Sequence, residues 1–483
     1  MTRRVVGPFN RVEGDLEISL EIEDNRVKAA WINSPLYRGF ERMLVGRDPR
    51  DALVITPRIC GICSVAQSLA CAEALADAQG ITPPLNGALT RNIILATENI
   101  ADHLTHFYLF FMPDFARPIY AGEPWHDRVA ERFKAVEGSA PRDMLPARAA
   151  FMHIMGQLAG HWPHTLGLQP GGTTHAIDAA GQARVLATLA TFRRFLETHL
   201  FGDKLEIVAS LGSARELDAW CDRVRPSHGD FAAFLRLSRS LGLDRLGRGT
   251  DSFLSFGAYA VGGEHHFQRG VHESGRDAKL DAREIREDCA NTWMIHRDQP
   301  RHPSQGITAP NAEAAGAYTW CKAPRLSGKV MEVGALARQV IDGHPLARDL
   351  VSQTGGSVMA RVVARLLEIA RLIPAIEEWT QRIRPGEPFF TQSAMPDEAS
   401  GSGLIEAARG ALGHWLTIRN GHIANYQIVA PTTWNFSPRD GSGKPGVCEQ
   451  ALANAPVQQG EREPVAVQHI VRSFDPCMVC TVH

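Results

Sequence analysis

Apolar and polar residues alternate in a strand-like segment near the start of the chain. From Leu16 to Ile22 every second residue is apolar and those between are polar or charged, as in a half-buried β-strand. Asp24 and Asn25 form a turn signal, and residues 27–32 are again mostly apolar. The pattern predicts an antiparallel hairpin.

Further along, the chain becomes alanine-rich or repeats apolar residues every three or four positions, which is the helical period. The longest helices are predicted over residues 64–79, 92–112, 176–200 and 357–383, with Ser357 as the N-cap of the last. Residues 248–305 show no clear period, which predicts loops and short strands. We expect an α+β fold, predominantly α, with a central bundle of long helices and peripheral β-hairpins and loops.

No internal repeat, low-complexity tract or linker divides the chain, which favours one compact unit over residues 1–483. Within that unit we expect four parts. They are a β-rich N-terminal part over 1–50, a helical core over 51–240 and 330–430, an irregular insertion over 241–329, and a C-terminal metal-binding tail over 431–483.

The composition narrows the classes of function. Over 483 residues the net charge is −2 and 22% of residues are charged, which provides neither a basic field for nucleic acid nor a polybasic patch for an anionic membrane. The apolar run 107–112 is too short to cross a bilayer, and the N-terminus lacks a secretory apolar segment. We expect a soluble protein with no nucleic-acid partner and no direct membrane insertion.

Cysteine is the most informative residue type. The chain has nine cysteines, an odd number that argues against a disulfide framework. Four of them form two Cys-x-x-Cys pairs, Cys60 with Cys63 and Cys477 with Cys480, at opposite ends of the chain. If the fold brings the pairs together, four thiolates would form a site for a soft metal.

One Cys-x-x-Cys pair is weak evidence, because thioredoxin-like sites, zinc knuckles and chance also produce it. Structural zinc is the simplest alternative for four cysteines. Zinc sites usually connect small local loops, however, and these two pairs lie at opposite ends of the chain. Arg58, Asp475 and His483 flank the pairs in sequence, which suits a reactive, hydrogen-bonded site better than a sealed structural one.

The sequences around the pairs, Arg-Ile-Cys-Gly-Ile-Cys and Asp-Pro-Cys-Met-Val-Cys-Thr-Val-His, resemble the two signatures of the large subunit of nickel–iron hydrogenases. The resemblance covers the whole chain. It separates this chain from the related quinone-binding subunit of respiratory complex I, which lacks these cysteines. Further motifs that carry it are Arg11 to Gly14, Arg38 to Glu41, Asp102-His103, Glu406 to Gly410, Tyr426-Gln427, Pro431 to Asn435 and Ser437 to Asp440.

The resemblance implies a nickel–iron centre held by the four cysteines. Cys60 and Cys477 would be terminal ligands of nickel, while Cys63 and Cys480 would bridge nickel to iron. The iron in this family also carries one CO and two cyanides. Two divalent metals, four thiolates and two cyanides give a charge of roughly −2, which needs cationic or hydrogen-bonding neighbours when buried.

The resemblance also assigns roles to residues around that centre. The guanidinium of Arg409 would face the open side of the metals and polarise H2, together with a thiolate ligand as base. Asp102 and Asp475 would hold that guanidinium in place, although an ordinary Arg–Asp ion pair is the simpler interpretation of the residues alone. Thr432 would donate a hydrogen bond to a cyanide.

Two further assignments follow from the family. Glu13 would accept the proton from the thiolate of Cys477 and pass it outward, with a pKa raised by burial and negative neighbours. Glu41 and His483, with a backbone carbonyl near Val429, would hold a buried Mg²⁺, although Fe²⁺ would also fit. This ion would fasten the C-terminal tail.

Several positions depart from the common family pattern. Gln67 stands where most members have His, Ala408 replaces the usual Pro, and His161 replaces Lys or Arg. Ile62 and Phe110 replace the smaller Val and Leu at the inner end of a hydrophobic gas tunnel, where extra volume would hinder O2 more than H2. Ile62, Gln67 and Phe110 together look like the H2-sensing, or regulatory, subclass, and an ending at His483 fits that subclass too.

We therefore expect the large subunit of a cytoplasmic H2-sensing hydrogenase with low turnover. Its electrons would leave through a small subunit that carries all the Fe–S clusters, because this chain has no further cysteine array. The signal would pass to a sensor histidine kinase. An uptake hydrogenase that feeds respiration is the alternative in the same class, and a structural zinc-binding scaffold is the alternative in another class.

Overall fold

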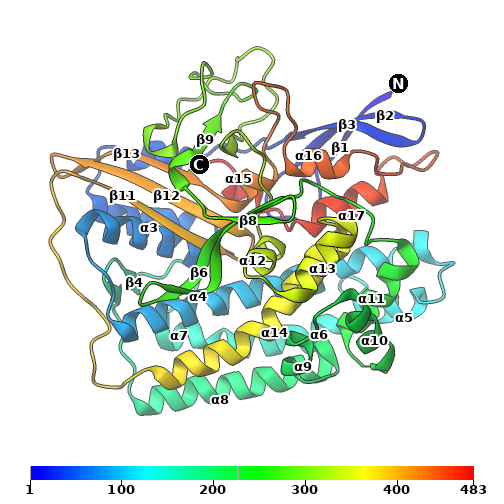
Figure 1. Ribbon diagram of the computed structural model, residues 1–483, viewed down its shortest axis with the longest axis horizontal. Helices are drawn as coiled ribbons and strands as arrows, with labels where there is room; N and C mark the ends of the chain where they lie inside the picture. The colour runs from blue at the N-terminus through cyan, green and yellow to red at the C-terminus, as the bar shows by residue number, and fades with distance from the viewer. Residues whose placement is uncertain (1, 226–227) are drawn as a thin grey trace.

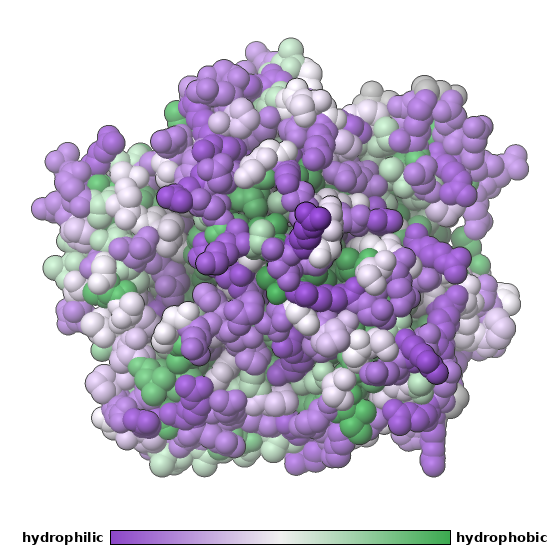
Figure 2. Space-filling view, in the orientation of Figure 1, coloured by the Kyte–Doolittle hydropathy of each residue, from purple (hydrophilic) through white to green (hydrophobic). Residues whose placement is uncertain are grey.

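The computed structural model describes residues 2–225 and 228–483. Helices take up 45% of the chain and strands 19%, so the predicted α+β class with predominant helix is confirmed. Hydrophilic residues cover most of the face shown in Figure 2, and apolar ones come to the surface in smaller patches, one of them near its centre. In the described part of the chain, every helix is too short or too polar to span a bilayer.

Long helices form the centre of the molecule. Helix α14 (Val358–Arg382) packs against α4 (Leu85–Thr105) and α8 (Ala179–Phe195), and the three run close to one another in the lower half of Figure 1. Ser357 caps α14 by accepting a hydrogen bond from the Ala360 N–H, as predicted. Helix α3 (Ser64–Gln79) has the bounds expected from the sequence.

Helix α4 begins earlier than expected because Pro84 is its N-cap, a position where proline has no helical N–H to lose. Its C-terminal end continues as a π-helical segment, His106–Phe111. Such widened turns often occur at functional sites. Helix α8 ends in a similar segment, Leu196–Phe201.

The predicted N-terminal hairpin is present as β2 (Glu17–Glu23) and β3 (Arg26–Asn33), with β1 (Thr2–Val6) antiparallel to β2. Asp24 and Asn25 turn the chain with positive φ angles of 50° and 56°. The hairpin predicted from the alternation of apolar and polar residues and from the turn signal is therefore confirmed.

Two regions differ from the prediction. The expected helical range 330–430 ends in an antiparallel sheet of β11 (Ala399–Ala407), β12 (Gly410–Arg419) and β13 (His422–Val429). Helix α3 lies against β11 so closely that a Cβ at Gly403 would be 1.9 Å from the Ala70 carbonyl oxygen. The small residues at the start of β11 allow this packing, and they also obscure the alternating pattern by which a strand is recognised in the sequence.

The expected irregular insertion 241–329 contains two ten-residue strands, β6 (Ser252–Val261) and β7 (Glu264–Glu273). Gly262 and Gly263 join them with φ angles of 61° and 88°, a conformation glycine adopts without strain. The remainder of this range contains only short strands. They are β8 (Arg276–Ala278) and β9 (Ile285–Asp288), and β9 pairs with β10 (Ala323–Leu326).

The remaining elements are short. Helices α1 (Phe40–Leu44), α2 (Ala52–Ile55), α5 (His126–Phe133), α6 (Ala140–Phe151), α7 (His153–Ala159), α9 (Leu205–Ala209), α10 (Ala214–Arg223) and α11 (Asp230–Leu241) precede β6. Helices α12 (Ala335–Ile341) and α13 (Pro345–Thr354) precede α14, and α15 (Pro431–Asn435), α16 (Val447–Leu452) and α17 (Val465–Ser473) follow β13. Strands β4 (Leu168–Gln169) and β5 (Gly172–Thr173) pair with each other.

Segments near the two ends of the chain pair with each other. Backbone hydrogen bonds join Val27 to the segment 454–455, with N···O distances of 3.0 and 2.8 Å. In Figure 1 the blue β3 accordingly runs beside the orange α16. A parallel β-bridge also pairs Glu13 with Cys477. These contacts bring the two cysteine pairs together.

Candidate metal centre

The four predicted cysteines converge in the interior. The sulfur of Cys60 lies 3.5 Å from that of Cys477, and the sulfur of Cys63 lies 3.1 Å from that of Cys480. All four sulfurs lie within 4.8 Å of one another, and all four residues are buried. A compact, buried set of sulfur donors fits a soft metal.

Local structure places each pair. Cys60 follows a 3₁₀ turn, Thr56–Ile59, and Cys63 is the N-cap residue of α3. The second pair belongs to the tail after α17, where Met478–Cys480 form a short 3₁₀ turn. Both pairs are thus held at bends of the backbone, which lets their side chains point to one centre.

Arg38 joins the two pairs. Its Nη2 donates hydrogen bonds to the carbonyls of Ile59 and Val479, each of which directly precedes a cysteine of the site. Arg38 belongs to a family motif, Arg38 to Glu41, but no role for it was predicted from the sequence. Only the fold reveals that one guanidinium reaches both ends of the chain.

Four thiols this close together do not ionise independently. The pKa of Cys60 is lowered because the thiols of Cys477, Cys480 and Cys63 stabilise its thiolate. Burial raises the pKa of Cys477 and of Cys480. A metal cation would supply the charge that allows all four to be thiolates. The donor set therefore fits a metal centre.

Arg409 stands at the tip of the hairpin between β11 and β12, whose loop is only Ala408-Arg409. Its Nη2 donates to the Oδ1 atoms of Asp102, at 3.0 Å, and Asp475, at 3.1 Å, and its Nε donates to the Asp475 carbonyl at 2.7 Å. The Nη1 atom lies 3.0 Å from Asp102 Oδ2, but has no hydrogen-bond partner among the described residues.

The charge of Arg409 is fixed by its neighbours. Burial would lower its pKa, but Asp102, Asp475, Cys477 and Cys63 raise that pKa well above the usual value. Its hydrogen bonds to Asp475, two residues before Cys477, place the guanidinium near the second cysteine pair. The structure thus brings together the arginine, the two carboxylates and the thiols that the sequence singled out.

Thr432 lies beside the second cysteine pair. Its Oγ1 accepts a hydrogen bond of 3.1 Å from the Cys477 N–H. The hydroxyl proton is therefore free to donate elsewhere, which agrees with the predicted donor role without testing it.

Glu13 is held next to Cys477 through the backbone. The Met478 N–H donates to the Glu13 carbonyl at 2.6 Å, and the Glu13 N–H donates to the Pro476 carbonyl at 3.3 Å. Gly14 allows this approach, because a Cβ there would lie 3.0 Å from the Val479 side chain. Burial and the nearby Cys60 raise the pKa of the half-buried Glu13 carboxyl.

Glu41 and His483 line one small cavity of about 10 Å³ near the C-terminus. Both residues are buried, and His483 Nε2 has no hydrogen-bond partner among the described residues. Glu41 Oε1 accepts from the Ile428 N–H at 2.8 Å, and Lys322 Nζ lies 3.6 Å from Glu41 Oε2. An orphaned imidazole nitrogen beside a carboxylate fits a small cation. Val429, however, is not among the residues that line this cavity.

The residues that depart from the family pattern are also placed. Ile62 is partly buried against the main core, and Phe110 lies partly exposed in the π-helical segment. Gln67 is buried one helical turn after Cys63, and its Oε1 lies 2.8 Å from His414 Nε2. His161 is exposed.

Arg58 does not take part in the site, contrary to the expectation from its position. Its side chain is exposed and donates to the Val54 carbonyl. The 3₁₀ turn before Cys60 directs this side chain outward. Asp475 and His483, the other flanking residues, are buried as expected.

Glu98 is a buried residue that the sequence analysis missed. Its carboxylate accepts from the N–H groups of Val65 and Ala66, both at 2.9 Å, and from Trp162 Nε1 at 2.8 Å. It therefore caps α3, since the N-cap side chain of Cys63 makes no capping bond. Burial raises the pKa of Glu98 to about 7.

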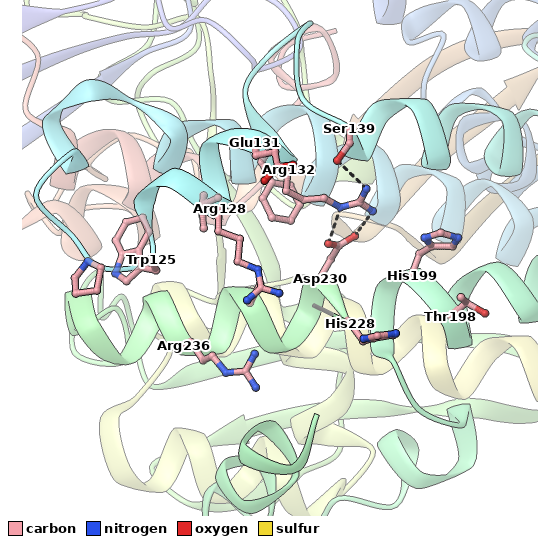
Figure 3. A pocket seen from close by; sticks show the side chains of 15 residues that line it. Trp125, Arg128, Glu131, Arg132, Ser139, Thr198, His199, His228, Asp230 and Arg236 are labelled. Atoms are coloured by element: carbon pink, nitrogen blue, oxygen red, sulfur yellow. Dashed lines mark hydrogen bonds and ion pairs between the residues drawn. The ribbon is translucent and has the colours of Figure 1, made fainter. Parts of the chain in front are cut away.

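A larger cavity, of about 630 Å³, lies elsewhere and contains none of the predicted site residues. Figure 3 shows Arg132 pointing at Asp230, to which it donates from Nε and Nη2. Arg132 also forms an ion pair with Asp143. Its charge is thus compensated, and the described residues of the cavity lining offer no cluster of metal ligands.

A buried set of four thiols beside an arginine that two carboxylates hold defines a protein that binds a soft metal centre. The sequence profile of nickel-dependent hydrogenases matches residues 38–128 and 142–483. The chain belongs to the nickel-dependent hydrogenase family, whose members are oxidoreductases that act on H2.

Relatives match the chain along its whole length. It is 31% identical over 513 residues to the periplasmic NiFeSe hydrogenase large subunit of Desulfomicrobium baculatum, covering 99% of this chain and 94% of that protein. It is 28% identical over 577 residues to the uptake hydrogenase large subunit of Rhodobacter capsulatus, covering 100% and 95%.

The solved structures agree. The Ni-Fe-Se hydrogenase from D. vulgaris Hildenborough in the reduced state matches with a TM-score of 0.84 at 30% identity, covering 100% of both chains. The expected fold of a hydrogenase large subunit is confirmed.

Proposed function

We propose that this chain is the active-site subunit of a hydrogenase that cleaves H2 heterolytically to protons and electrons. The observation that carries the proposal is the meeting of Cys60, Cys63, Cys477 and Cys480 beside the guanidinium of Arg409. Family membership and the buried sulfur set both favour this function over a zinc scaffold.

A nickel–iron centre with one CO and two cyanides, held by the four thiolates, would supply the electron-accepting metals when bound. The chain's own residues would control the charge and the proton. Arg409 stays cationic and is held near the second cysteine pair by Asp475, so it is able to polarise H2 in a dry site. Asp102 and Asp475 fix its direction by ion pairs of 3.0 and 3.1 Å.

Proton removal would begin at the sulfur of Cys477 and continue to Glu13. A carboxylate with a raised pKa is a better acceptor near neutral pH than an ordinary one. The backbone pairing of Glu13 with Cys477 keeps this acceptor close to the donor. Thr432, whose hydroxyl proton is free, would hold a cyanide.

Glu41 and His483 would hold Mg²⁺ or Fe²⁺ next to the second cysteine pair. Such an ion would bind Glu41, which Lys322 also approaches, and would satisfy the orphaned His483 nitrogen. It would thereby fasten the last residues of the tail that carries Cys480.

Large hydrogenase subunits pair with a small subunit. We propose that Fe–S clusters in such a partner carry the electrons away from this chain.

We propose further that the complex is a cytoplasmic H2 sensor of low turnover that signals to a histidine kinase. The combination of Ile62, Gln67 and Phe110, which resembles the regulatory subclass, supports this role. The match to the uptake hydrogenase of Rhodobacter capsulatus favours uptake as the second candidate. A fast, respiration-linked turnover with no kinase response would favour the second.

Metal analysis of the complex purified with its partner tests the central proposal. We expect nickel and iron, and infrared bands of CO and cyanide bound to iron. Cys480→Ser should remove the nickel and the bands, whereas Cys448→Ser, at a buried cysteine outside the site, should retain both. Zinc without nickel would refute the hydrogenase function.

A further inference from the structure

Arg338 is a fully buried arginine whose five N–H donors are all used. It lies in α12, and its Nε and Nη2 donate to the two oxygens of Glu368 at 2.9 and 2.8 Å. Its Nη1 donates to Glu406 Oε2 at 2.8 Å. A planar guanidinium bound on every edge has one orientation.

The two remaining bonds of Arg338 reach the hairpin that carries Arg409. Nη1 donates to the Ala407 carbonyl at 2.8 Å, and Nη2 donates to the Ala408 carbonyl at 2.9 Å. These are the two residues directly before Arg409. The hairpin also lies tightly on α12, because a Cβ at Gly410 would be 2.5 Å from the Gly334 nitrogen.

The same network reaches the helix that carries Asp102. Glu368 Oε1, which accepts from Arg338, also lies 3.1 Å from Nε2 of His103. His103 directly follows Asp102 in α4. Arg338 is thus connected to the two residues before Arg409. Through Glu368 it is also connected to His103, which is adjacent to Asp102, the carboxylate partner of Arg409.

The tip of this hairpin has no proline to fix its backbone. Its loop is Ala408-Arg409, and Gly410 follows with a φ of 128°. The usual family residue before the arginine is proline, which fixes φ, whereas Ala408 leaves the backbone free to rotate. External hydrogen bonds to the carbonyls of residues 407 and 408 supply that restraint here.

We propose that Arg338 is a positioning residue for H2 cleavage, which sets the direction of Arg409 through the backbone of the β11–β12 hairpin. This inference rests on the proposed role of Arg409. Displacements of about 1 Å at a reacting group reduce rates by up to about 100-fold. Loss of the hydrogen bonds from Arg338 to the hairpin should therefore lower the rate of H2 cleavage.

The test is Arg338→Lys in the complete complex, since lysine keeps the charge but lacks the planar fork. We expect H/D exchange activity to fall by about 10- to 100-fold, with nickel content unchanged. Amide hydrogen exchange in residues 404–412 should become faster, and the CO and cyanide infrared bands should shift. Arg325→Lys is the matched control, because Arg325 is also buried and makes five hydrogen bonds, to residues away from Arg409.

Rescue distinguishes a positioning role from general damage. Adding Ala408→Pro to Arg338→Lys should restore part of the activity, because proline restrains the hairpin tip independently. If Arg338→Lys does not assemble, Glu406→Gln, which perturbs one bond of Arg338, should give a smaller loss with the same faster amide exchange.

A comparison with Arg409→Lys separates the two proposals. If Arg409→Lys keeps full H/D exchange, the role of Arg409 is wrong. If Arg409→Lys loses activity while Arg338→Lys keeps it, only the role of Arg338 is wrong. If Arg338→Lys lowers activity equally in the presence and absence of Arg409, it does not act through Arg409, and the inference is also overturned.

Discussion

Glu13 and Cys477 are backbone neighbours, paired as in a parallel β-bridge although they lie at opposite ends of the chain. The hydrogen bonds on both sides of the bridge fix the Glu13 main chain relative to the cysteine. The pairing involves only main-chain atoms, so a change of the Glu13 side chain should leave it intact.

This pairing makes Glu13→Gln a clean test of the proton path. The amide is nearly isosteric but does not accept a proton near neutral pH, so H/D exchange should fall by about 100-fold or more. Nickel content and infrared bands should stay as in the unmodified protein. Glu17→Gln, on the neighbouring strand β2, serves as control, and full exchange in Glu13→Gln would contradict the relay.

Arg38→Lys should weaken assembly of the metal centre. Lysine is a single point donor, which does not reproduce the guanidinium fork that reaches the carbonyls of Ile59 and Val479. We expect a loss of about 1–3 kcal/mol in unfolding free energy and a lower nickel content after purification. Arg58→Lys, at the exposed arginine, should change the unfolding free energy and the nickel content only slightly. Equal losses in the two variants would show that Arg38 does not join the two cysteine pairs.

Replacing both bulky residues, Ile62→Val with Phe110→Leu, should make H/D exchange more sensitive to O2. The smaller side chains would widen the expected gas passage, because packed interiors leave little spare volume. Activity is measured before and after exposure to O2. Ile373→Val, in the core of α14, controls for the stability loss of about 0.5–1.5 kcal/mol that an Ile→Val change causes. Unchanged O2 inhibition in the double variant would exclude the tunnel argument.

Glu449 should make the metal-free chain less stable as the pH rises. Burial raises the pKa of its carboxyl to about 7, from a value of 4.5. The folded state thus favours the protonated form, so the stabilisation is complete below pH 4.5 and is lost as the pH rises to about 7. The loss amounts to about 3 kcal/mol at most.

The thermal midpoint of Glu449→Gln between pH 4.5 and 7.5 should accordingly vary less than that of the unmodified chain. The variant loses the acceptor that Glu449 Oε2 offers the Gly446 N–H, so its midpoint is expected to be lower at acidic pH. Identical pH profiles for the two proteins would show that Glu449 does not titrate in this range.

Local patterns in the sequence predicted the elements that local chemistry determines. The bounds of α3 follow from its composition, and the hairpin β2–β3 follows from alternation around Asp24-Asn25. The sheet β11–β13 was missed because glycines at 401 and 403 break the apolar pattern of β11. The Asn420-Gly421 turn, with φ angles of 49° and 72°, is a hairpin signal that would have revealed β12 and β13.

The site shows the same limit. Resemblance and spacing identified the cysteines, Arg409, Asp102 and Glu13, and the fold places them together. The roles of Arg38, Glu98 and Arg338 were not predicted, because each of them binds backbone atoms that are distant in the sequence. Carbonyls and N–H groups look alike at every residue, so only the folded chain shows which of them a buried charge will find.

The joining of residues 27 and 455 and of residues 13 and 477 has a consequence for biosynthesis. The first cysteine pair is synthesised long before the second, so a nascent chain that has not reached Cys477 lacks half of the metal ligands. A centre bound by all four thiolates can therefore form only after the segment with Cys477 and Cys480 has been made and has paired with residues 13 and 27.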